Sequence, residues 1–137
     1  EVLKAQQQYP HIHYLGAMTR EQVKEQMQRS DLFVLATQEY RGRKEAAGLV
    51  TLEAQACGTP VVVNRSGGAA EMLSEGVSGF TAERENPESL ARQMHKFLSL
   101  DPGGQLEMGK QAREFVVNER SLASSCRELL AIYQALL

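Results

Sequence analysis

Asp31-Leu32-Phe33-Val34-Leu35-Ala36 and Pro60-Val61-Val62-Val63-Asn64 are the two apolar stretches that decide the fold. Continuous apolar runs of this length are typical of strands that a parallel sheet buries on both faces. Between them lies a mostly apolar helical segment, Gly48 to Cys57, which ends at Gly58. This alternation of strand, helix and strand predicts an α/β domain with a Rossmann-like parallel sheet flanked by helices.

Further elements extend the pattern in both directions. Before the first strand we expect the end of a helix at Val2–Gln8, a short strand at His11-Ile12-His13-Tyr14-Leu15, and a helix to about Arg29 that begins with the capping box Thr19-Arg20-Glu21-Gln22. After the second strand we expect a turn at Ser66-Gly67-Gly68, a short helix at Ala69–Leu73, a weak strand at Gly79–Ala82, a helix that Asn86 caps, a break at Pro102-Gly103-Gly104, and helices at about Leu106–Val117 and Leu122–Leu137.

Composition excludes several classes of function. The 137 residues carry a net charge of −2, which excludes a strongly basic nucleic-acid binder. No apolar run approaches the roughly 18 residues of a membrane helix, and the N-terminus lacks the layout of a signal peptide. Cys57 and Cys126 have no metal-ligand spacing, so we interpret both as core residues in a reducing, cytoplasmic protein. The histidines also lack metal spacing, and no metal site is expected.

Glu53 is the most informative side chain, because it is the only charged residue between Ala46 and Val63. A helix this apolar should pack against the sheet, so we expect Glu53 to be at least partly buried. An unpaired buried carboxylate is very costly and needs hydrogen-bond donors from the protein or from a ligand. The adjacent hydroxyls of a ribose can both donate to one carboxylate.

The start of the same helix offers a second binding feature. The free amides of Gly48, Leu49 and Val50 should point at whatever lies in front of the helix, and a helix N-terminus favours phosphate. Gly48 would let a ligand approach the backbone closely. With Glu45 before the helix and Glu53 two turns inside it, the order of groups matches the sugar, diphosphate and ribose of a nucleotide sugar.

The spacing Glu45-x7-Glu53, with Gly48 inside it and Ala56-Cys57-Gly58-Thr59-Pro60-Val61-Val62 after it, resembles the nucleotide-sugar signature of glycosyltransferase family 4. These are retaining enzymes of the GT-B fold. The likeness spans about Ile12 to Leu98 and includes four more motifs: Gly16, Asp31-Leu32-Phe33-Val34-Leu35, Ser66-Gly67-Gly68-Ala69-Ala70-Glu71 and Gly76-Val77-Ser78-Gly79-Phe80. Ala47 departs from the pattern, since an aromatic residue is commoner just before that glycine.

The resemblance implies a role for each matching position. Glu45 would contact the donor sugar near its anomeric centre, as the catalytic residue. Gly48, Leu49 and Val50 would offer amides to the sugar and diphosphate, and Glu53 would hold the ribose hydroxyls. The substrate would be a UDP-, GDP- or ADP-sugar, no metal or other cofactor would be required, and a hexosyl group would pass to a glycan, lipid or small-molecule acceptor.

The resemblance also predicts what the chain lacks. Family members carry two earlier βα units and an N-terminal acceptor domain, so residues 1–137 are expected to form a partial nucleotide-sugar-binding domain without transfer activity of its own. The absent strands would lie in the centre of the sheet, between the Ile12–Leu15 strand and the Leu32–Ala36 strand, so the chain must leave an unpaired edge, shift its strand pairing or borrow a partner. We therefore expect self-association through this edge or through the apolar face of the last helix, and a cytoplasmic or membrane-peripheral location for the full-length enzyme.

Other residues at the strand ends are weaker candidates. Arg43, Lys44 and Arg65 could contact the diphosphate or could simply be solvated. Gly67 and Gly68 would allow a turn close to the donor, and Glu71 is either a supporting residue or a charge in the first turn of its helix.

Three alternative functions stay open at this stage. Two carboxylates could serve a glycosidase, although a glutamate within a buried helix suits an open cleft poorly. The domain could also be a non-catalytic nucleotide-sugar-binding or receiver-like regulatory module, or part of a GT-B nucleotide-sugar epimerase.

Overall fold

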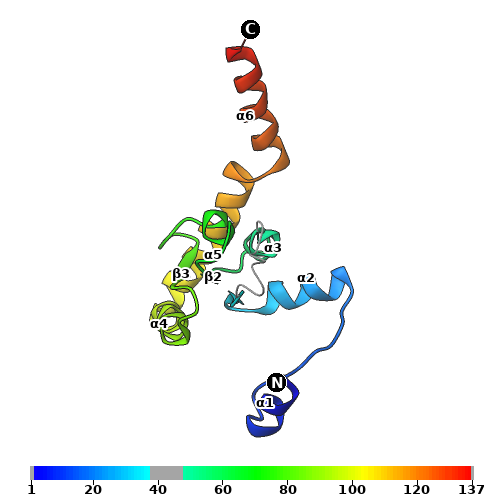
Figure 1. Ribbon diagram of the computed structural model, residues 1–137, viewed down its shortest axis with the longest axis vertical. Coiled ribbons are helices and arrows are strands. Elements are labelled where there is room, and N and C mark those ends of the chain that lie inside the picture. Colours follow the sequence, from blue (N-terminus) through cyan, green and yellow to red (C-terminus); the bar gives the residue numbers. More distant parts are fainter. Residues whose placement is uncertain (1, 38–47, 137) are drawn as a thin grey trace.

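The structure, a computed structural model, describes residues 2–37 and 48–136. Figure 1 shows a central body with one helix reaching away at each end. The elements follow in the order α1 (Val2–Gln8), α2 (Arg20–Arg29), β1 (Phe33–Leu35), α3 (Leu49–Ala56), β2 (Val61–Asn64), the short 3-10 helix η1 (Ala69–Met72), β3 (Gly79–Ala82), α4 (Pro87–Leu98), α5 (Pro102–Glu119) and α6 (Leu122–Ala135).

The strands of the described residues form one parallel sheet in the order β1-β2-β3. Phe33 of β1 lies opposite Val61 of β2, which in turn lies opposite Gly79 of β3. The three valines of the central strand are completely buried. The predicted α/β fold with a parallel sheet is therefore confirmed, and the carboxyl ends of all three strands meet at one edge.

Side chains of the sheet alternate between two cores, one on each face. Val61 and Val63 pack with α2, α3 and η1, where Met27, Ala54, Ala69 and Leu73 complete the cluster. Val62 faces the other way and packs with Phe80, Phe97 and Met108. Helices thus cover both faces of the sheet, which explains why its strands read as continuous apolar runs.

The capping box at the start of α2 is confirmed. The Thr19 hydroxyl accepts a hydrogen bond from the Gln22 amide at 3.3 Å, and the Gln22 side chain accepts one from the Thr19 amide at 2.9 Å. Asn86 caps α4 in the same way, because its side chain accepts from the Ser89 amide, with Pro87 in the first position of the helix.

Replacing Thr19 with alanine is expected to lower the free energy of unfolding by about 1 kcal/mol, because the Gln22 amide loses its acceptor. Urea denaturation monitored by circular dichroism measures the change. Ser99→Ala is the control: the Ser99 hydroxyl donates to the His95 carbonyl oxygen at an exposed helix end and caps no amide. Equal effects of the two substitutions would contradict a capping role for Thr19.

Two predicted elements are corrected. The segment His11–Leu15 is not a strand; Tyr14 and Leu15 are exposed, and no described strand lies beside the segment to share backbone hydrogen bonds. Pro102-Gly103-Gly104 does not separate two helices but begins α5, where Asp101 caps the helix by accepting from the Gly104 amide at 2.8 Å. Proline and glycine are tolerated there because the first amides of a helix need no carbonyl partner within it.

The last helix exposes much of its apolar face, as predicted. It packs on α5 and reaches away from the body (Figure 1). Cys126 is exposed rather than buried in a core, whereas Cys57 packs against the cluster between α3 and the sheet. The exposed apolar residues of α6 and its C-cap are Leu122, Leu129, Leu130, Ile132, Tyr133 and Leu136. No helix within residues 2–37 and 48–136 is both long and apolar enough to cross a bilayer.

Candidate nucleotide-sugar site

The N-terminus of α3 lies at the carboxyl edge of the sheet, where ligands of open α/β folds bind. Gly48 precedes the helix with a φ of 59°, a left-handed conformation that favours glycine. A side chain there would also meet Ala69, since an added Cβ would lie 3.3 Å from the Ala69 Cβ. Leu49 and Val50 supply the first amides of the helix, which have no carbonyl partner within it.

Buried oxygens without partners lie at the same carboxyl edge of the sheet. Thr51 Oγ1, Asn64 Oδ1 and Ser66 Oγ are all buried and accept or donate no hydrogen bond within the described residues. They come from the first turn of α3, the end of β2 and the turn that follows it. Leaving a buried polar atom unsatisfied costs about 1–3 kcal/mol, so the three oxygens favour a polar ligand or water at this edge.

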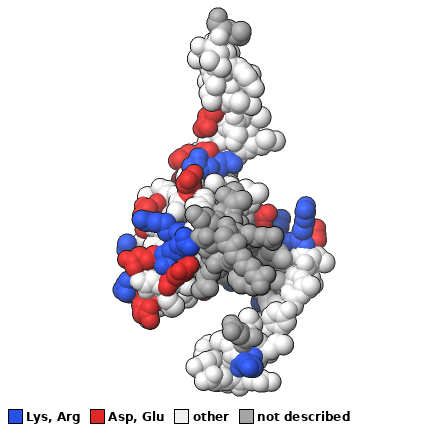
Figure 2. Space-filling view, in the orientation of Figure 1, with Lys and Arg blue, Asp and Glu red and all other residues white. Residues whose placement is uncertain are grey.

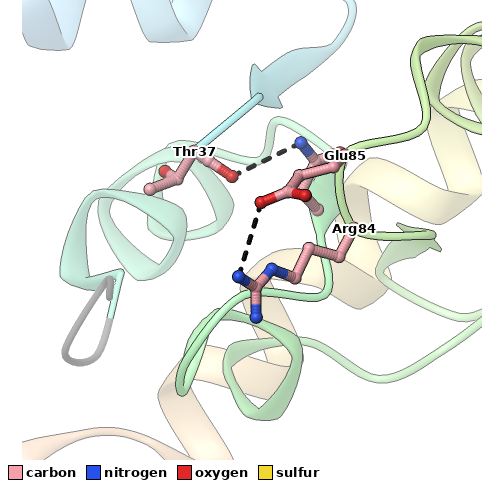
Figure 3. A network of polar contacts seen from close by, with 4 residues as sticks. Thr37, Arg84 and Glu85 are labelled. Carbon is pink, nitrogen blue, oxygen red and sulfur yellow. Dashed lines mark hydrogen bonds and ion pairs between the residues drawn. The ribbon is translucent and has the colours of Figure 1, made fainter. Parts of the chain in front are cut away.

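Asn64 also connects neighbouring strands. Its Nδ2 donates to the carbonyl oxygen of Thr37, which follows β1, at 3.4 Å. Figure 3 shows Thr37 close to Arg84 and Glu85, which follow β3 and form an ion pair at 3.4 Å. Residues from the carboxyl ends of all three strands therefore gather at one place.

Glu53 is exposed, and the prediction that it is at least partly buried is wrong. The buried face of α3 consists of Thr51, Ala54 and Gln55. Because successive residues of a helix are separated by about 100°, Glu53 lies on nearly the opposite side from Thr51 and Gln55. The scarcity of charge in this helix therefore did not indicate which way its single carboxylate points.

The Glu53 side chain instead lines a groove between α2, α3 and α5, with a volume of about 690 Å³. The volume lies within the range of about 300–1,000 Å³ that is usual for small-molecule sites. Apolar groups form part of its wall, namely Val23, Met27 and Cys57, and its charged lining residues are Arg20, Lys24, Glu53 and Arg113. This mixture suits a ligand with a flat apolar part and polar hydroxyls.

Two long-range hydrogen bonds hold α3 in place, and neither was predicted. The buried Gln55 donates through Nε2 to the carbonyl oxygen of Met72, at 2.6 Å. Arg113 of α5 donates to the carbonyl oxygen of Ala56 at the end of α3. No local sequence signal marks either bond, because the partners are 17 and 57 residues apart.

The weaker candidates fall in different places. The Arg65 guanidinium donates to Thr81 Oγ1 at 3.1 Å, on the β3 side of the edge. Gly67 and Gly68 form the turn that leads into η1, whose first residue, Ala69, contacts the Gly48 position. Glu71 is exposed; its amide donates to the Gly68 carbonyl oxygen at 3.0 Å, and its carbonyl oxygen accepts from the Arg120 guanidinium at 3.2 Å. Glu45, Arg43 and Lys44 lie outside the described residues.

The model of the family described as "Glycosyl transferases group 1" matches residues 3–115. The chain belongs to this family. The match includes the whole sheet, α3 and the groove that Glu53 lines. The resemblance to this glycosyltransferase family noted from the sequence is thereby confirmed.

Named relatives of this group 1 chain are glycosyltransferases. It is 34% identical over 91 residues to a D-inositol 3-phosphate glycosyltransferase of Nocardiopsis dassonvillei, with 66% of this chain and 21% of the relative aligned. It is 35% identical over 108 residues to the N-acetyl-alpha-D-glucosaminyl L-malate synthase of Bacillus anthracis, with 79% and 26% aligned. The chain therefore spans about a fifth to a quarter of the length of these relatives.

Solved structures confirm the fold. A glycosyltransferase of Rickettsia africae is 32% identical, with a TM-score of 0.64 over 77% of this chain and 27% of the other. HepE of Anabaena, crystallised with UDP, is 25% identical, with a TM-score of 0.64 over 82% of this chain and 29% of the other. The sucrose-phosphate synthase of Thermosynechococcus elongatus, at 23% identity, shares the fold with a TM-score of 0.76 over 98% and 33%.

Proposed function

We propose that this chain forms the donor-binding part of a retaining glycosyltransferase that transfers a hexosyl group from a nucleotide sugar. The observation that carries the proposal is the N-terminus of α3, where free amides, a left-handed Gly48 and unpartnered buried oxygens meet at the carboxyl edge. Family membership and the relative crystallised with UDP support it. A cytoplasmic location and self-association through β1 or α6 stay predictions.

The proposed donor would lie across α3. Its diphosphate would face the amides of Leu49 and Val50, where the helix dipole favours negative charge. Sugar hydroxyls would satisfy the buried oxygens at this edge. The ribose hydroxyls would donate to Glu53, with the base extending along the groove beside α2. Glu45 would contact the donor sugar near its anomeric centre, as predicted from the sequence.

The same arrangement would assist transfer of the sugar. When the bond between the sugar and the diphosphate breaks, negative charge builds on the leaving diphosphate. Amides that already point at this position stabilise the charge without rearrangement. In this role the helix start would bind the developing charge more strongly than the ground state, which is what acceleration requires.

Replacing Glu53 with glutamine tests the proposal. Loss of the carboxylate should weaken UDP binding by about ten- to hundredfold, because a hydrogen bond to a charged group contributes roughly 1.5–3 kcal/mol. Titration of the chain with UDP at millimolar concentrations, followed by nuclear magnetic resonance (NMR) shifts of its amides, measures even weak affinity. GDP and ADP titrations compare the bases.

The matched control is Glu128→Gln on α6, which removes an exposed carboxylate far along the chain from the groove. The control should leave UDP affinity unchanged. An unchanged affinity in Glu53→Gln, or UDP-induced shifts that avoid Leu49 and Val50, would contradict the proposed site.

A further inference from the structure

A second cavity opens beside the carboxyl end of β3, away from the groove that Glu53 lines. It has a volume of about 390 Å³, and three of its lining residues are the arginines Arg65, Arg84 and Arg92. We call it the arginine cavity. Figure 2 shows basic and acidic side chains gathered over the part of the molecule that carries β3 and α4. No residue of α3 lines the arginine cavity.

Three elements bring the arginines together. Arg65 follows β2 directly, and its side chain is held by the bond to Thr81 Oγ1. Arg84 stands two residues after the end of β3. Arg92 projects from α4, one turn beyond Ser89, which also lines the arginine cavity. The convergence is thus a product of the fold, since Arg65 and Arg92 are far apart in the sequence.

The lining of the arginine cavity carries an excess of positive charge. Its charged residues are Arg65, Arg84, Arg92 and Glu83, so three positive charges stand against one negative charge. The Glu83 carboxylate accepts a hydrogen bond from Asn86 Nδ2 at 2.5 Å, and the Glu75 carboxylate, outside the cavity, accepts from the amide and hydroxyl of Thr81. Glu85 pairs with Arg84. Within the described residues, neither Arg65 nor Arg92 forms an ion pair. Their guanidinium groups offer the planar donor geometry that binds phosphate in a bidentate manner.

Gln93 contributes an unpartnered hydrogen-bond acceptor to the arginine cavity. It lines the arginine cavity, and its Oε1 is buried without a hydrogen-bond partner among the described residues. A buried amide oxygen needs a donor, and a phosphate dianion has none to give. A hydroxyl group on the same ligand would supply one.

We propose that the arginine cavity binds a small phosphate monoester that also carries hydroxyl groups, such as a sugar phosphate. The phosphate would lie against Arg65 and Arg92, and a hydroxyl would donate to Gln93 Oε1. Near neutral pH a phosphate monoester carries a charge of about −1.5 to −2. Such a ligand matches a cluster of guanidinium groups better than a ligand with one carboxylate, which carries a single negative charge. The proposal does not depend on the donor site at α3.

Glucose 6-phosphate, inorganic phosphate and glucose are the probes, each titrated against the chain with affinity measured from amide NMR shifts. Glucose 6-phosphate should bind most tightly, with shifts at residues that line the arginine cavity. Arg92→Gln and Arg65→Gln should each weaken its binding by about tenfold or more. Arg127→Gln, an exposed arginine on α6, should change nothing.

Gln93→Leu tests the hydroxyl contact separately. This variant should lose the preference for glucose 6-phosphate over inorganic phosphate while still binding phosphate. UDP is the last probe, and its affinity should be unchanged by Arg92→Gln. This arm distinguishes failure of the arginine cavity from failure of the α3 site.

Three outcomes would overturn the proposal: no binding of glucose 6-phosphate at millimolar concentration, unchanged affinity in both arginine variants, or shifts confined to Leu49 and Val50. The third would place the phosphate at the start of α3. All of the substituted arginines are exposed, so the variants are expected to fold.

Discussion

Gly109→Ala is expected to lower the free energy of unfolding by about 2–3 kcal/mol. Gly109 is buried in the middle of α5, where that helix crosses the turn after α3. An added Cβ would lie 2.5 Å from the carbonyl oxygen of Gly58, and a backbone atom cannot move aside as the end of a side chain can. Helix propensity alone predicts the opposite sign, a gain of about 1 kcal/mol.

Gly103→Ala in the same helix is the matched control. A Cβ at Gly103 would meet nothing closer than 3.7 Å, at the Asp101 carboxylate, so this substitution should leave stability unchanged or raise it slightly. Urea denaturation of both variants gives the comparison. Stabilisation by Gly109→Ala would show that α5 does not approach Gly58 as closely as the structure has it.

Gly48→Ala should damage both stability and ligand binding. Its left-handed φ of 59° costs a residue with a side chain about 1–2 kcal/mol, and the 3.3 Å approach to Ala69 adds a steric penalty. On the proposed function, the added methyl group would also stand beside the amides that face the diphosphate. UDP affinity should therefore fall together with stability.

Gly16→Ala separates the backbone penalty of the left-handed φ from the steric penalty of the contact with Ala69. Gly16 has a similar φ of 70°, but a Cβ there would meet nothing within 4 Å. This variant should show the backbone penalty alone and leave UDP affinity unchanged. Equal losses of stability in the two variants would remove the contact with Ala69 from the explanation.

Local signals predicted much of the fold because the physics behind them is local. The apolar runs Phe33–Leu35 and Val61–Asn64 had only one environment that suited them, a sheet covered on both faces. Thr19 and Asn86 were recognised as caps because the amides they satisfy lie three residues away. The start of α3 was predicted at Gly48 because the glycine directly precedes the apolar helical run, which is also a local signal.

The failures share another cause, since each depended on what lies across space. His11–Leu15 has the composition of a strand, but a strand also needs a neighbour. Glu53 was placed inside because its helix is apolar, although the direction in which it points depends on helical phase. The convergence of Arg65 and Arg92 follows from the parallel pairing of β2 with β3 and the packing of α4 against both strands, which no short motif encodes.

The bonds that hold α3 have a consequence for any ligand at its start. Gln55 bonds the last turn of the helix to Met72, Arg113 bonds its final residue, Ala56, and Thr59, just beyond the helix, donates to the carbonyl oxygen of Met27. A binding helix held in this way loses little conformational entropy when a ligand binds to it, because the helix was already ordered when the chain folded. The amides at the helix start are in this sense preorganised, and more of the intrinsic contact energy is left to appear as affinity.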